Sequence, residues 1–365
     1  MEPPATPRVW AVISYRAGER AQVLALARAL GWPFEIKELA LRGSAALVSL
    51  VQASNLRGIR LEQSDRLAPP WPDVVISAGM RNEPVVRWIR EQSGGRTRLV
   101  HIGRPWGPLS RFDLVITTPQ YRLPRRPNVL HNPLTLHSMT RESLRAAADT
   151  WQSRLTDLPR PWIAVIVGGN SGPYTFGARA ARRLARQASE KAREQGGSLL
   201  VTTSARTTSQ AGQVLAEHIT VPRHFYPWRP DDENNPYFGY LALADAIIVT
   251  ADSISMLTEA CATGKPVYMF DTGSGRQAMR PNAGPGDDDN DFRLSGHLYR
   301  GVMRWAPKRL SRDITLVHRS LCAAGNAVWL GESFPDQTPP PLRDMEHAVV
   351  RVRALFTADE QTVTV

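Results

Sequence analysis

The fold class of this chain follows from one stretch, Ala244-Asp-Ala-Ile-Ile-Val-Thr-Ala-Asp-Ser253-Ile-Ser-Met-Leu-Thr-Glu259-Ala-Cys-Ala-Thr-Gly264-Lys-Pro-Val-Tyr-Met-Phe270. An apolar run from Ala246 to Val249 is followed by a polar turn, a helical segment, Gly-Lys-Pro and a second apolar run. This order predicts a βαβ unit whose polar turn lies at the carboxyl end of the first strand. In open α/β sheets that edge is where ligands bind.

Polar side chains are concentrated in this turn and in the helix after it. Asp252 and Ser253 are favourable N-cap residues, so the helix should begin there and offer free backbone N–H groups to an anion such as a diphosphate. Ser255 and Glu259 are four residues apart and share one helix face, where a carboxylate can accept two hydrogen bonds from a ribose diol. A purely structural βαβ unit would carry the same cap, but it would not need so many polar residues.

Length and composition indicate a two-domain globular protein. The chain has 365 residues, of which 42% are hydrophobic, and no apolar run approaches the roughly 20 residues that span a bilayer. The N-terminus lacks the basic start and apolar core of a secretory signal. The only cysteines, Cys261 and Cys322, stand in apolar surroundings, so a disulfide or a metal site is not expected. We therefore expect a cytoplasmic protein without a metal or bound cofactor.

The net charge is +11 and the isoelectric point is about 10.2. Such a surface attracts phosphates, nucleic acid or anionic lipid. Nucleic acid is the weaker candidate, because the arginines are spread along the chain and no nucleic-acid motif accompanies them. A peripheral position at the inner face of a membrane is compatible with the charge.

Strand and helix patterns alternate along both halves, which predicts two doubly wound α/β domains. We expect an N-terminal domain over 1–150, a linker over 151–161, a C-terminal domain over 162–334, and a Pro-rich linker with a final helix over 335–365. The expected strands are 9–14, 34–39, 72–79, 98–102, 114–117, 162–170 and 198–203, and the expected helices are 18–30, 82–92, 176–195 and 344–356.

The second half offers two further polar turns at strand ends. Gly168-Gly-Asn170 ends one strand, where glycines would allow the backbone to approach a phosphate. Ser204 and Arg206 follow the next strand, and a guanidinium binds phosphate oxygens in a bidentate manner. Each turn taken singly has a plain structural explanation. Because the carboxyl ends of parallel strands share one edge, the three turns together predict one binding site.

The first half carries a matching set of strand-end residues. Arg16-Ala-Gly18-Glu19-Arg-Ala-Gln22 follows the first strand, and His101-Ile-Gly-Arg104 covers the end of a later one. His101 and Glu19 are candidate general bases, although an ordinary hydrogen-bonded loop residue explains each of them as well.

Two charged features carry less weight. Arg179, Arg182, Arg183 and Arg186 form a basic stripe along one helix face, which we interpret as a solvated outer face, with contact to anionic lipid as the minority interpretation. Asp287-Asp-Asp-Asn-Asp291 does not match a calcium loop and is interpreted as a mobile, solvated loop. The chain has no Gly-x-Ser-x-Gly elbow, His-Glu-x-x-His pair or paired-cysteine motif, which disfavours hydrolases and metalloenzymes.

Several of these stretches resemble the ELM-type (elongated mitochondria) mitochondrial-fission family, which has many bacterial members. The resemblance is strongest in Gly168-Gly-Asn-Ser, Thr203-Ser-Ala-Arg206-Thr and Val249-Thr-Ala-Asp-Ser-Ile-Ser-Met-Leu-Thr-Glu-Ala-Cys-Ala-Thr-Gly-Lys-Pro-Val267. The segments 16–22 and 111–116 resemble the N-terminal half of the family less tightly. In plants the family's named role is recruitment of the fission machinery to the mitochondrial outer membrane.

That family is in turn similar to GT-B glycosyltransferases. The stretch 244–270 resembles the donor-binding βαβ unit of the lipid-linked N-acetylglucosaminyltransferase of peptidoglycan synthesis, in which a glutamate at the place of Glu259 holds the nucleotide ribose. The glycine loop of the family falls on Gly168 and Gly169. Here Ala251-Asp252-Ser253 replaces the small glycine-containing turn of that enzyme, which leaves the sugar preference open.

The resemblance implies a GT-B-like protein with two Rossmann-like domains facing a central cleft. It implies metal-independent transfer from a nucleotide-diphosphate sugar to an acceptor, for which a membrane-associated glycolipid suits the basic surface. From the strand-end turns and the resemblance together, we expect the donor-binding residues to be Gly168, Gly169, Asn170, Ser204, Arg206, Asp252, Ser253, Ser255, Met256 and Glu259, and the acceptor-side residues to be Gly18, Gln22 and Arg104.

Two alternatives to a glycosyltransferase stay open. The first is a non-catalytic peripheral membrane adaptor that retains a GT-B-like scaffold. The second is a nucleotide-sugar epimerase of another α/β type, against which the absence of a dinucleotide fingerprint and of a Tyr-x-x-x-Lys pair counts.

Overall fold

The computed structural model describes residues 6–50, 53–281, 289–305, 311–336 and 339–360, and the chain forms two compact units. The first unit comprises Met1–Ser138, Lys308–Asp313 and Arg343–Val365, and the second comprises Met139–Pro307 and Ile314–Leu342. Each unit contains one six-stranded sheet in which every pairing is parallel. The prediction of two doubly wound α/β domains is therefore confirmed.

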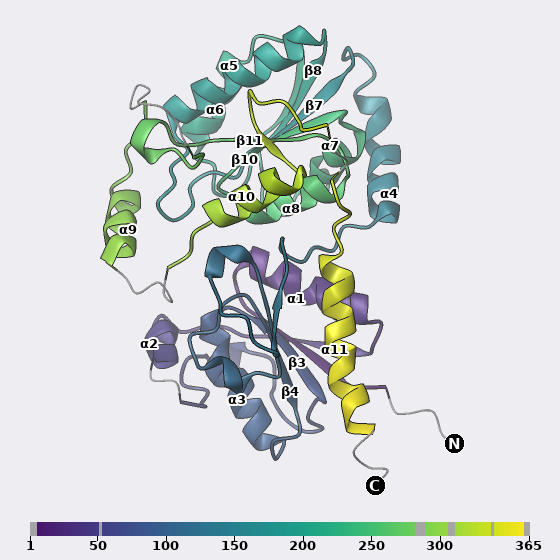
Figure 1. Cartoon of the computed structure of the whole chain (residues 1–365), viewed down its shortest axis with the longest axis vertical. Coiled ribbons are helices and arrows are strands. Elements are labelled where there is room, and N and C mark those ends of the chain that lie inside the picture. Colours follow the sequence, from purple (N-terminus) through teal and green to yellow (C-terminus); the bar gives the residue numbers. More distant parts are fainter. Residues whose placement is uncertain (1–5, 51–52, 282–288, 306–310, 337–338, 361–365) are drawn as a thin grey trace. The chain divides into compact units, whose positions relative to one another are not determined.

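The sheet of the first unit has helices on both faces (Figure 1). Its strands run in the order β2 (Phe34–Glu38), β1 (Val9–Ile13), β3 (Val74–Ala78), β4 (Arg98–Ile102), β5 (Leu114–Thr117) and β6 (Val129–His131). Apolar residues of β1, β3, β4 and β5 pack with α1 (Ala17–Leu30) and α11 (Asp344–Glu360) on one side. On the other side they pack with α3 (Glu83–Gln92), while α2 (Ala45–Leu50) lies nearby.

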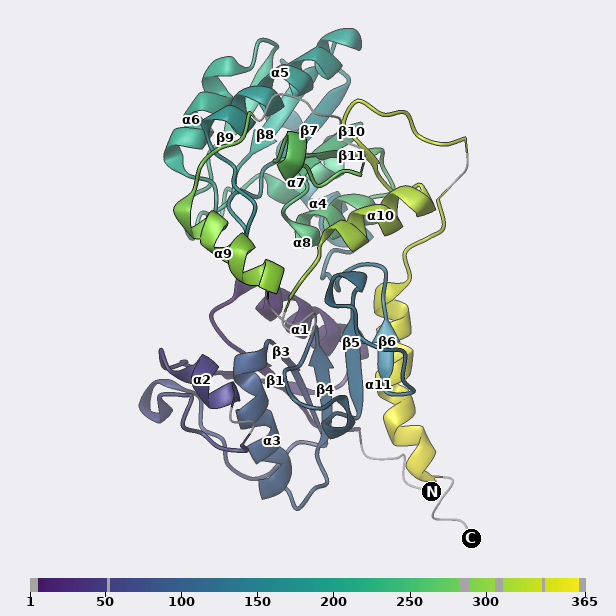
Figure 2. The ribbon, with the colours of Figure 1, turned by 60° about the vertical axis from the view of Figure 1, so that its left-hand side comes forward.

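The sheet of the second unit is built in the same way (Figure 2). Its strands run in the order β12 (Val328–Trp329), β11 (Val267–Phe270), β10 (Ala246–Thr250), β7 (Trp162–Ile166), β8 (Ser198–Thr202) and β9 (Arg223–Tyr226). The core of one face is closed by α5 (Ala178–Glu194) and α6 (Ser209–His218). The remaining helices are α4 (Arg141–Trp151), α7 (Tyr237–Leu243), α8 (Ile254–Ala262), α9 (Leu294–Trp305) and α10 (Thr315–Ala324).

Short 3-10 turns interrupt the connections of both units. They span Leu61–Gln63, Met80–Asn82, Leu109–Arg111, Pro119–Tyr121, Gln152–Arg154 and Gly275–Gln277. Within the described ranges, no helix combines the length and the apolar character that crossing a bilayer requires.

The unit boundaries differ from those expected from the sequence. The segment 151–161, expected to be a linker, begins with the buried Trp151 at the end of α4 and contains the buried Leu155. The ring of Trp151 packs edge-on against Tyr240 of α7, so α4 and the residues after it belong to the second unit. Pro159 and Pro161 are typical of a loop, but the buried side chains of Trp151 and Leu155 attach this segment to the second unit.

The final helix belongs to the first unit. Ala348 and Val352 of α11 are fully buried in the core that α1 covers, and Asn132 donates a 3.0 Å hydrogen bond to the backbone oxygen of Asp344. The chain therefore returns to its first unit after the second is complete.

Candidate functional site

Each sheet has one position where the chain reverses its direction of winding. In the second unit β7, β8 and β9 follow one another to one side, and β10 to β12 continue from the other side of β7. The reversal therefore lies between β7 and β10, which are adjacent, with Ile166 beside Val249. In the first unit the corresponding position lies between β1 and β3. Ligands of open α/β sheets bind outside the strand ends at such positions.

The turn after β7 is shaped by two buried glycines. A Cβ on Gly168 would lie 2.6 Å from Oδ2 of Asp252, and one on Gly169 would lie 2.4 Å from the backbone of Arg206. Gly169 also has φ of +115°, which only glycine adopts readily. The N–H of Gly168 donates to Oγ1 of Thr250 at 2.7 Å. The glycines thus make room for the Asp252 side chain and the Arg206 backbone, and the N–H of Gly168 is bound by Thr250.

The turns after β7 and β8 are joined by hydrogen bonds. The hydroxyl of Ser204 donates to the backbone oxygen of Gly168, and the N–H of Asn170 donates to the backbone oxygen of Arg206 at 3.1 Å. Nη1 of Arg206 donates in return to the backbone oxygen of Asn170 at 3.3 Å. The predicted residues of these two turns therefore form one rigid group.

An ion pair connects this group to the turn after β10. Nη1 of Arg206 lies 2.9 Å from Oδ2 of Asp252, whose side chain is 0% exposed while that of Arg206 is 37% exposed. Burial raises the pKa of Asp252, and the Arg206 guanidinium and the Thr250 hydroxyl oppose that shift. The side chain of Arg206 is thus partly exposed, and the buried carboxylate fixes its position.

The helix α8 begins where the sequence predicted. Ser253 occupies the N-cap position with extended backbone angles, but its side chain makes no capping hydrogen bond, and the first turn carries no acidic residue. Ser255 and Met256 are partly exposed in that turn. The N-terminus of α8 therefore retains its partial positive charge without a side-chain partner.

Glu259 lies one turn further along α8 and has a partner that the sequence did not indicate. The hydroxyl of Tyr237, in the first turn of α7, donates a hydrogen bond to Oε2 of Glu259. Burial raises the pKa of Glu259, and this hydrogen bond opposes the shift. The carboxylate is thus partly buried and held in one orientation by Tyr237.

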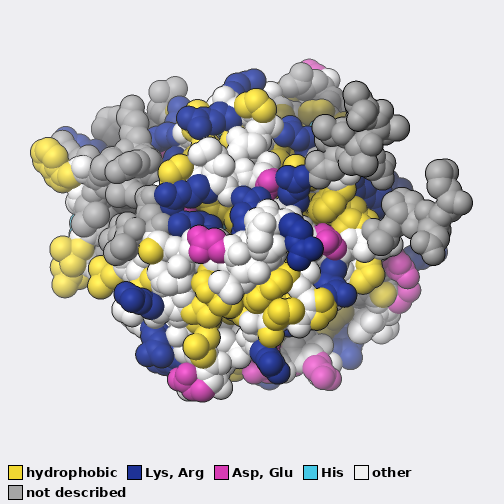
Figure 3. All heavy atoms as spheres, turned by 90° about the horizontal axis from the view of Figure 1, so that it is seen from below, with side chains coloured by type: hydrophobic (Ala, Val, Ile, Leu, Met, Phe, Trp, Pro, Cys, Tyr) yellow, Lys and Arg dark blue, Asp and Glu magenta, His cyan; other side chains and the backbone are white. Residues whose placement is uncertain are grey.

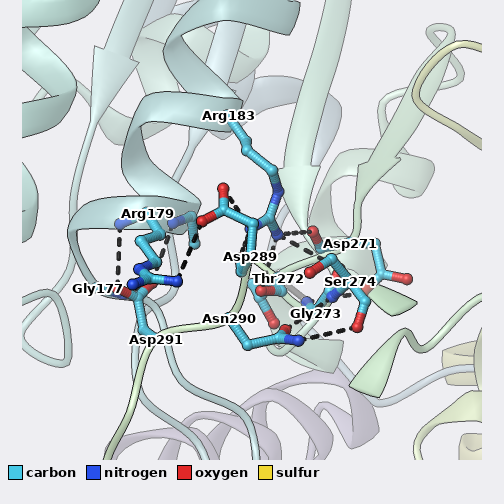
Figure 4. Close-up of polar contacts among 11 residues, drawn as sticks. Gly177, Arg179, Arg183, Asp271, Thr272, Gly273, Ser274, Asp289, Asn290 and Asp291 are labelled. Atoms are coloured by element: carbon cyan, nitrogen blue, oxygen red, sulfur yellow. Dashed lines mark hydrogen bonds and ion pairs between the residues drawn. The ribbon is translucent and has the colours of Figure 1, made fainter. Parts of the chain in front are cut away.

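The N-terminus of α5, in contrast, is already occupied by a carboxylate (Figure 4). Asp291 accepts hydrogen bonds from the backbone N–H groups of Gly177 at 2.9 Å, Arg179 at 3.0 Å and Ala180 at 3.0 Å. The interpretation of the acidic segment as solvated loop is therefore wrong for Asp291, while Asp287 lies outside the described residues. Of the two helix N-termini beside the β7–β10 position, α8 is the one without a side-chain capping hydrogen bond.

The basic stripe on α5 also needs correction. Arg179, Arg182 and Arg186 are exposed, but the side chain of Arg183 is only 13% exposed. Its guanidinium donates to the backbone oxygens that follow β11, those of Asp271 at 3.3 Å, Thr272 at 3.1 Å and Gly273 at 3.3 Å. Arg183 is therefore a structural tie between α5 and the end of β11.

In the first unit, Glu19 lies at the reversal position. A Cβ on Gly79, which follows β3, would lie 2.3 Å from Oε2 of Glu19, and Nη1 of Arg16 lies 3.1 Å from Oε1 of the same carboxylate. Glu19 is partly exposed. The turns after β1 and β3 thus meet at this carboxylate, as the turns after β7 and β10 meet at Asp252.

The other predicted residues of the first unit are placed differently. Gln22 donates to the backbone oxygen of Gly18 at 3.1 Å within α1, and Arg104 donates to the backbone oxygen of Ser311 at 3.3 Å. His101 is fully buried inside the sheet, with Nδ1 3.2 Å from the hydroxyl of Ser77. Burial lowers its pKa to about 3, so His101 is a core residue and a poor general base.

Comparison with known proteins adds the family. The family model described as mitochondrial fission ELM1 matches residues 17–281. The mitochondrial fission protein ELM1 of Arabidopsis thaliana is 31% identical over 249 residues, which cover 62% of this chain and 58% of the plant protein. The protein RP120 of Rickettsia prowazekii is 25% identical over 295 residues, or 72% of this chain and 82% of that protein.

Solved structures with a similar fold include an epimerase and MurG. A UDP-GlcNAc 2-epimerase from Methanocaldococcus jannaschii has 9% identity and a TM-score of 0.49, covering 95% of this chain and 99% of that one. MurG of Acinetobacter baumannii has 14% identity and a TM-score of 0.41, with the same coverage.

Proposed function

The chain belongs to the mitochondrial fission ELM1 family, and from that premise we propose that it is a glycosyltransferase-like protein whose second unit binds a nucleotide-diphosphate sugar. One observation carries this proposal. The Arg206 guanidinium, held by the buried Asp252, lies at the reversal of the sheet in a partly exposed side chain, and the turn that holds it leads directly into the uncapped N-terminus of α8.

In this proposal the diphosphate binds to Arg206 and to the first turn of α8. Arginine and the helix dipole both favour a doubly charged group there, and the hydroxyl of Ser255 can donate to it. Ser253, Met256, Asn170 and Ser204 line the same turns. Gly168 and Gly169 support the site indirectly by admitting the ion pair.

Glu259 receives the ribose. Its carboxylate retains acceptor capacity beyond the hydrogen bond from Tyr237. When the sugar departs, charge develops on the diphosphate, and the positive groups around it would stabilise the transition state. Arg206 and the N-terminus of α8 would thus stabilise the charge that a metal ion stabilises in other transferases.

In this proposal the acceptor binds to the first unit. We assign the general base to Glu19 rather than His101, because Glu19 is partly exposed at the reversal of its sheet. Gly18 and Gln22 adjoin it on α1, and Arg104 follows β4. The acceptor proposed is a hydroxyl compound carried by an anionic, membrane-associated lipid.

Calorimetric titration with uridine, guanosine, thymidine and cytidine diphosphate sugars tests the donor site. We expect one member of this panel to bind. Glu259→Ala should then weaken binding at least about tenfold, roughly 1.4 kcal/mol, with little change in Tm. Tyr237→Phe is the matched control, because it removes the partner but leaves the carboxylate. Absence of binding by the whole panel to folded protein overturns the proposal.

A second candidate function is that of a peripheral membrane adaptor without catalysis. The exposed Arg179, Arg182 and Arg186 on α5 favour it. Figure 3 shows a different face, on which Lys and Arg side chains lie in separate groups among apolar and uncharged ones. Two results together would favour the adaptor. Reversing the charge of the three arginines would abolish binding to anionic vesicles, and no nucleotide sugar would bind to the protein.

A further inference from the structure

The helix α9 presents apolar side chains to solvent. Phe292, just before it, is 75% exposed and Trp305, at its end, is 86% exposed, with Leu294 and Leu298 also exposed between them. Leu294, Leu298 and Trp305 are spaced by four and seven residues, which places them on one helix face. An exposed apolar face of this kind marks an interaction surface.

The opposite side of α9 is fastened to the second unit. Nη2 of Arg293 donates to the backbone oxygens of Gly172 at 2.5 Å and Tyr174 at 3.0 Å, and Nη2 of Arg300 donates to that of Pro173 at 3.1 Å. The ring of Tyr299 packs against Gly172, where a Cβ would lie 3.4 Å from it. The helix is thus held on the loop that follows β7, with its apolar face turned outward.

Asp291 adds a second fastening just before the helix. Its carboxylate is bound by three backbone N–H groups at the start of α5, and Nη1 of Arg183 donates to the backbone oxygen of Asp289 (Figure 4). The segment leading to α9 is therefore tied to the first turns of α5. A helix fixed in this way presents its apolar side chains in a defined position.

Charge indicates what this face contacts. The sequence from 292 to 305 contains three arginines and no aspartate or glutamate. Arg293 and Arg300 donate to the loop after β7, so attraction to an anionic surface rests on the absence of acidic residues here and on the net charge of +11. A basic helix with an apolar face and aromatic residues at both ends is the type that lies in the interface of an anionic bilayer, where Trp side chains are favoured.

We propose that α9 is a lipid-contact helix, whose residues Phe292, Leu294, Leu298 and Trp305 enter the headgroup region of an anionic membrane. The helix is attached to the loop after β7, so lipid contact would bring the edge of the second sheet that carries Arg206 to the membrane surface. The proposal does not depend on nucleotide binding, since the residues of α9 take no part in the donor site.

The test is co-sedimentation of the full chain with vesicles of phosphatidylcholine containing about 30 mol% phosphatidylglycerol, with pure phosphatidylcholine as the uncharged comparison. The wild type should bind the anionic vesicles and bind the uncharged ones far more weakly. Leu294→Asn together with Leu298→Asn removes apolar area without changing charge, and should lower the partition coefficient at least about tenfold.

A matched control uses apolar residues that are exposed elsewhere. Leu61→Asn together with Val350→Asn replaces side chains of similar exposure in the first unit and should leave vesicle binding unchanged. Circular dichroism and Tm establish that both double variants are folded. A separate titration with nucleotide sugars tests the proposed donor site, so that a negative result for one proposal is not taken as a negative result for the other.

Two outcomes would overturn the lipid assignment. One is vesicle binding by the α9 variant equal to that of the wild type. The other combines two observations. The wild type does not bind anionic vesicles, and sedimentation velocity shows that it self-associates and that the α9 substitutions convert it to a monomer. That second result assigns the face to another copy of the chain.

Discussion

The guanidinium of Arg206 lies 2.9 Å from the fully buried carboxylate of Asp252, and this ion pair joins the turns after β8 and β10 across the end of β7. It spans the position where the winding of the second sheet reverses. The pair therefore has a structural role that can be separated by experiment from its proposed part in binding.

Arg206→Met leaves the Asp252 carboxylate buried without its cation. We expect a loss of about 3 kcal/mol in unfolding free energy at pH 7.5, at the lower end for a buried pair because Arg206 is partly exposed. Burial raises the pKa of Asp252, so the variant's deficit should shrink as pH falls and the carboxylate is protonated. Urea unfolding at pH 7.5 and 5 measures both effects.

The double variant Arg206→Met with Asp252→Asn supplies the control. Removing the second charge should recover most of the lost stability, while affinity for a nucleotide sugar should stay low because the guanidinium is absent. A double variant as unstable as Arg206→Met alone would contradict this account.

Gly169→Ala should be strongly destabilising. The residue has φ of +115°, and a Cβ would lie 2.4 Å from the backbone of Arg206, so we expect a loss of at least about 2 kcal/mol. Gly212→Ala is the matched control, since Gly212 lies in α6 with nothing within 4 Å of a Cβ. It should stabilise the chain by about 0.5–1 kcal/mol. Chemical denaturation of the two variants compares them directly.

Asp291→Ala tests the cap on α5. The carboxylate accepts three backbone N–H bonds from a segment 114 residues away in sequence at its furthest, and its loss should cost about 1–2 kcal/mol, as for other N-caps. Asp291→Asn should cost less, because the amide oxygen can still accept. Asp157→Ala, at an exposed position, should change stability by no more than about 0.5 kcal/mol. Equal effects of all three substitutions would show that Asp291 does not cap the helix.

His101 should make the chain sensitive to acid. Burial lowers its pKa to about 3, whereas the unfolded chain has the ordinary value of about 6.5. Protonation of the unfolded state therefore reduces stability as pH falls below 6.5, by up to about 1.4 kcal/mol per pH unit.

The comparison variant is His101→Phe, which removes this titration. The stability of wild type minus that of the variant should decrease between pH 7.5 and pH 5, as measured by urea midpoints. A difference that stays constant with pH would show that His101 titrates normally in the folded chain.

Much of the fold could be predicted because the central strands are continuous apolar runs. Ile163 to Ile166 and Ile247 to Val249 have no polar interruption, as expected of parallel strands covered on both faces. The strand β9, Arg-His-Phe-Tyr, and the two-residue β12 lack such a pattern. They form because neighbouring strands supply hydrogen-bond partners, which local sequence does not reveal.

The site was predictable to the extent that strand ends share an edge. Arg206, Asp252 and Gly168 could be grouped because each follows a strand of the same parallel sheet. The partner of Glu259 could not be found, since Tyr237 lies on another helix and shares no local pattern with it. His101 was considered as a general base but is buried in the sheet. The sequence of a strand that is covered on both faces does not indicate which of its residues reach the edge of the sheet.

The C-terminal helix α11, packed in the core of the first unit, has a consequence for synthesis of the chain on the ribosome. Residues 1–138 emerge first, yet Ala348 and Val352 must be delivered before their core is closed. The second unit can complete its sheet while the first still exposes the apolar side of α1. We therefore expect the nascent first unit to depend longest on chaperones, although its sequence is translated earliest.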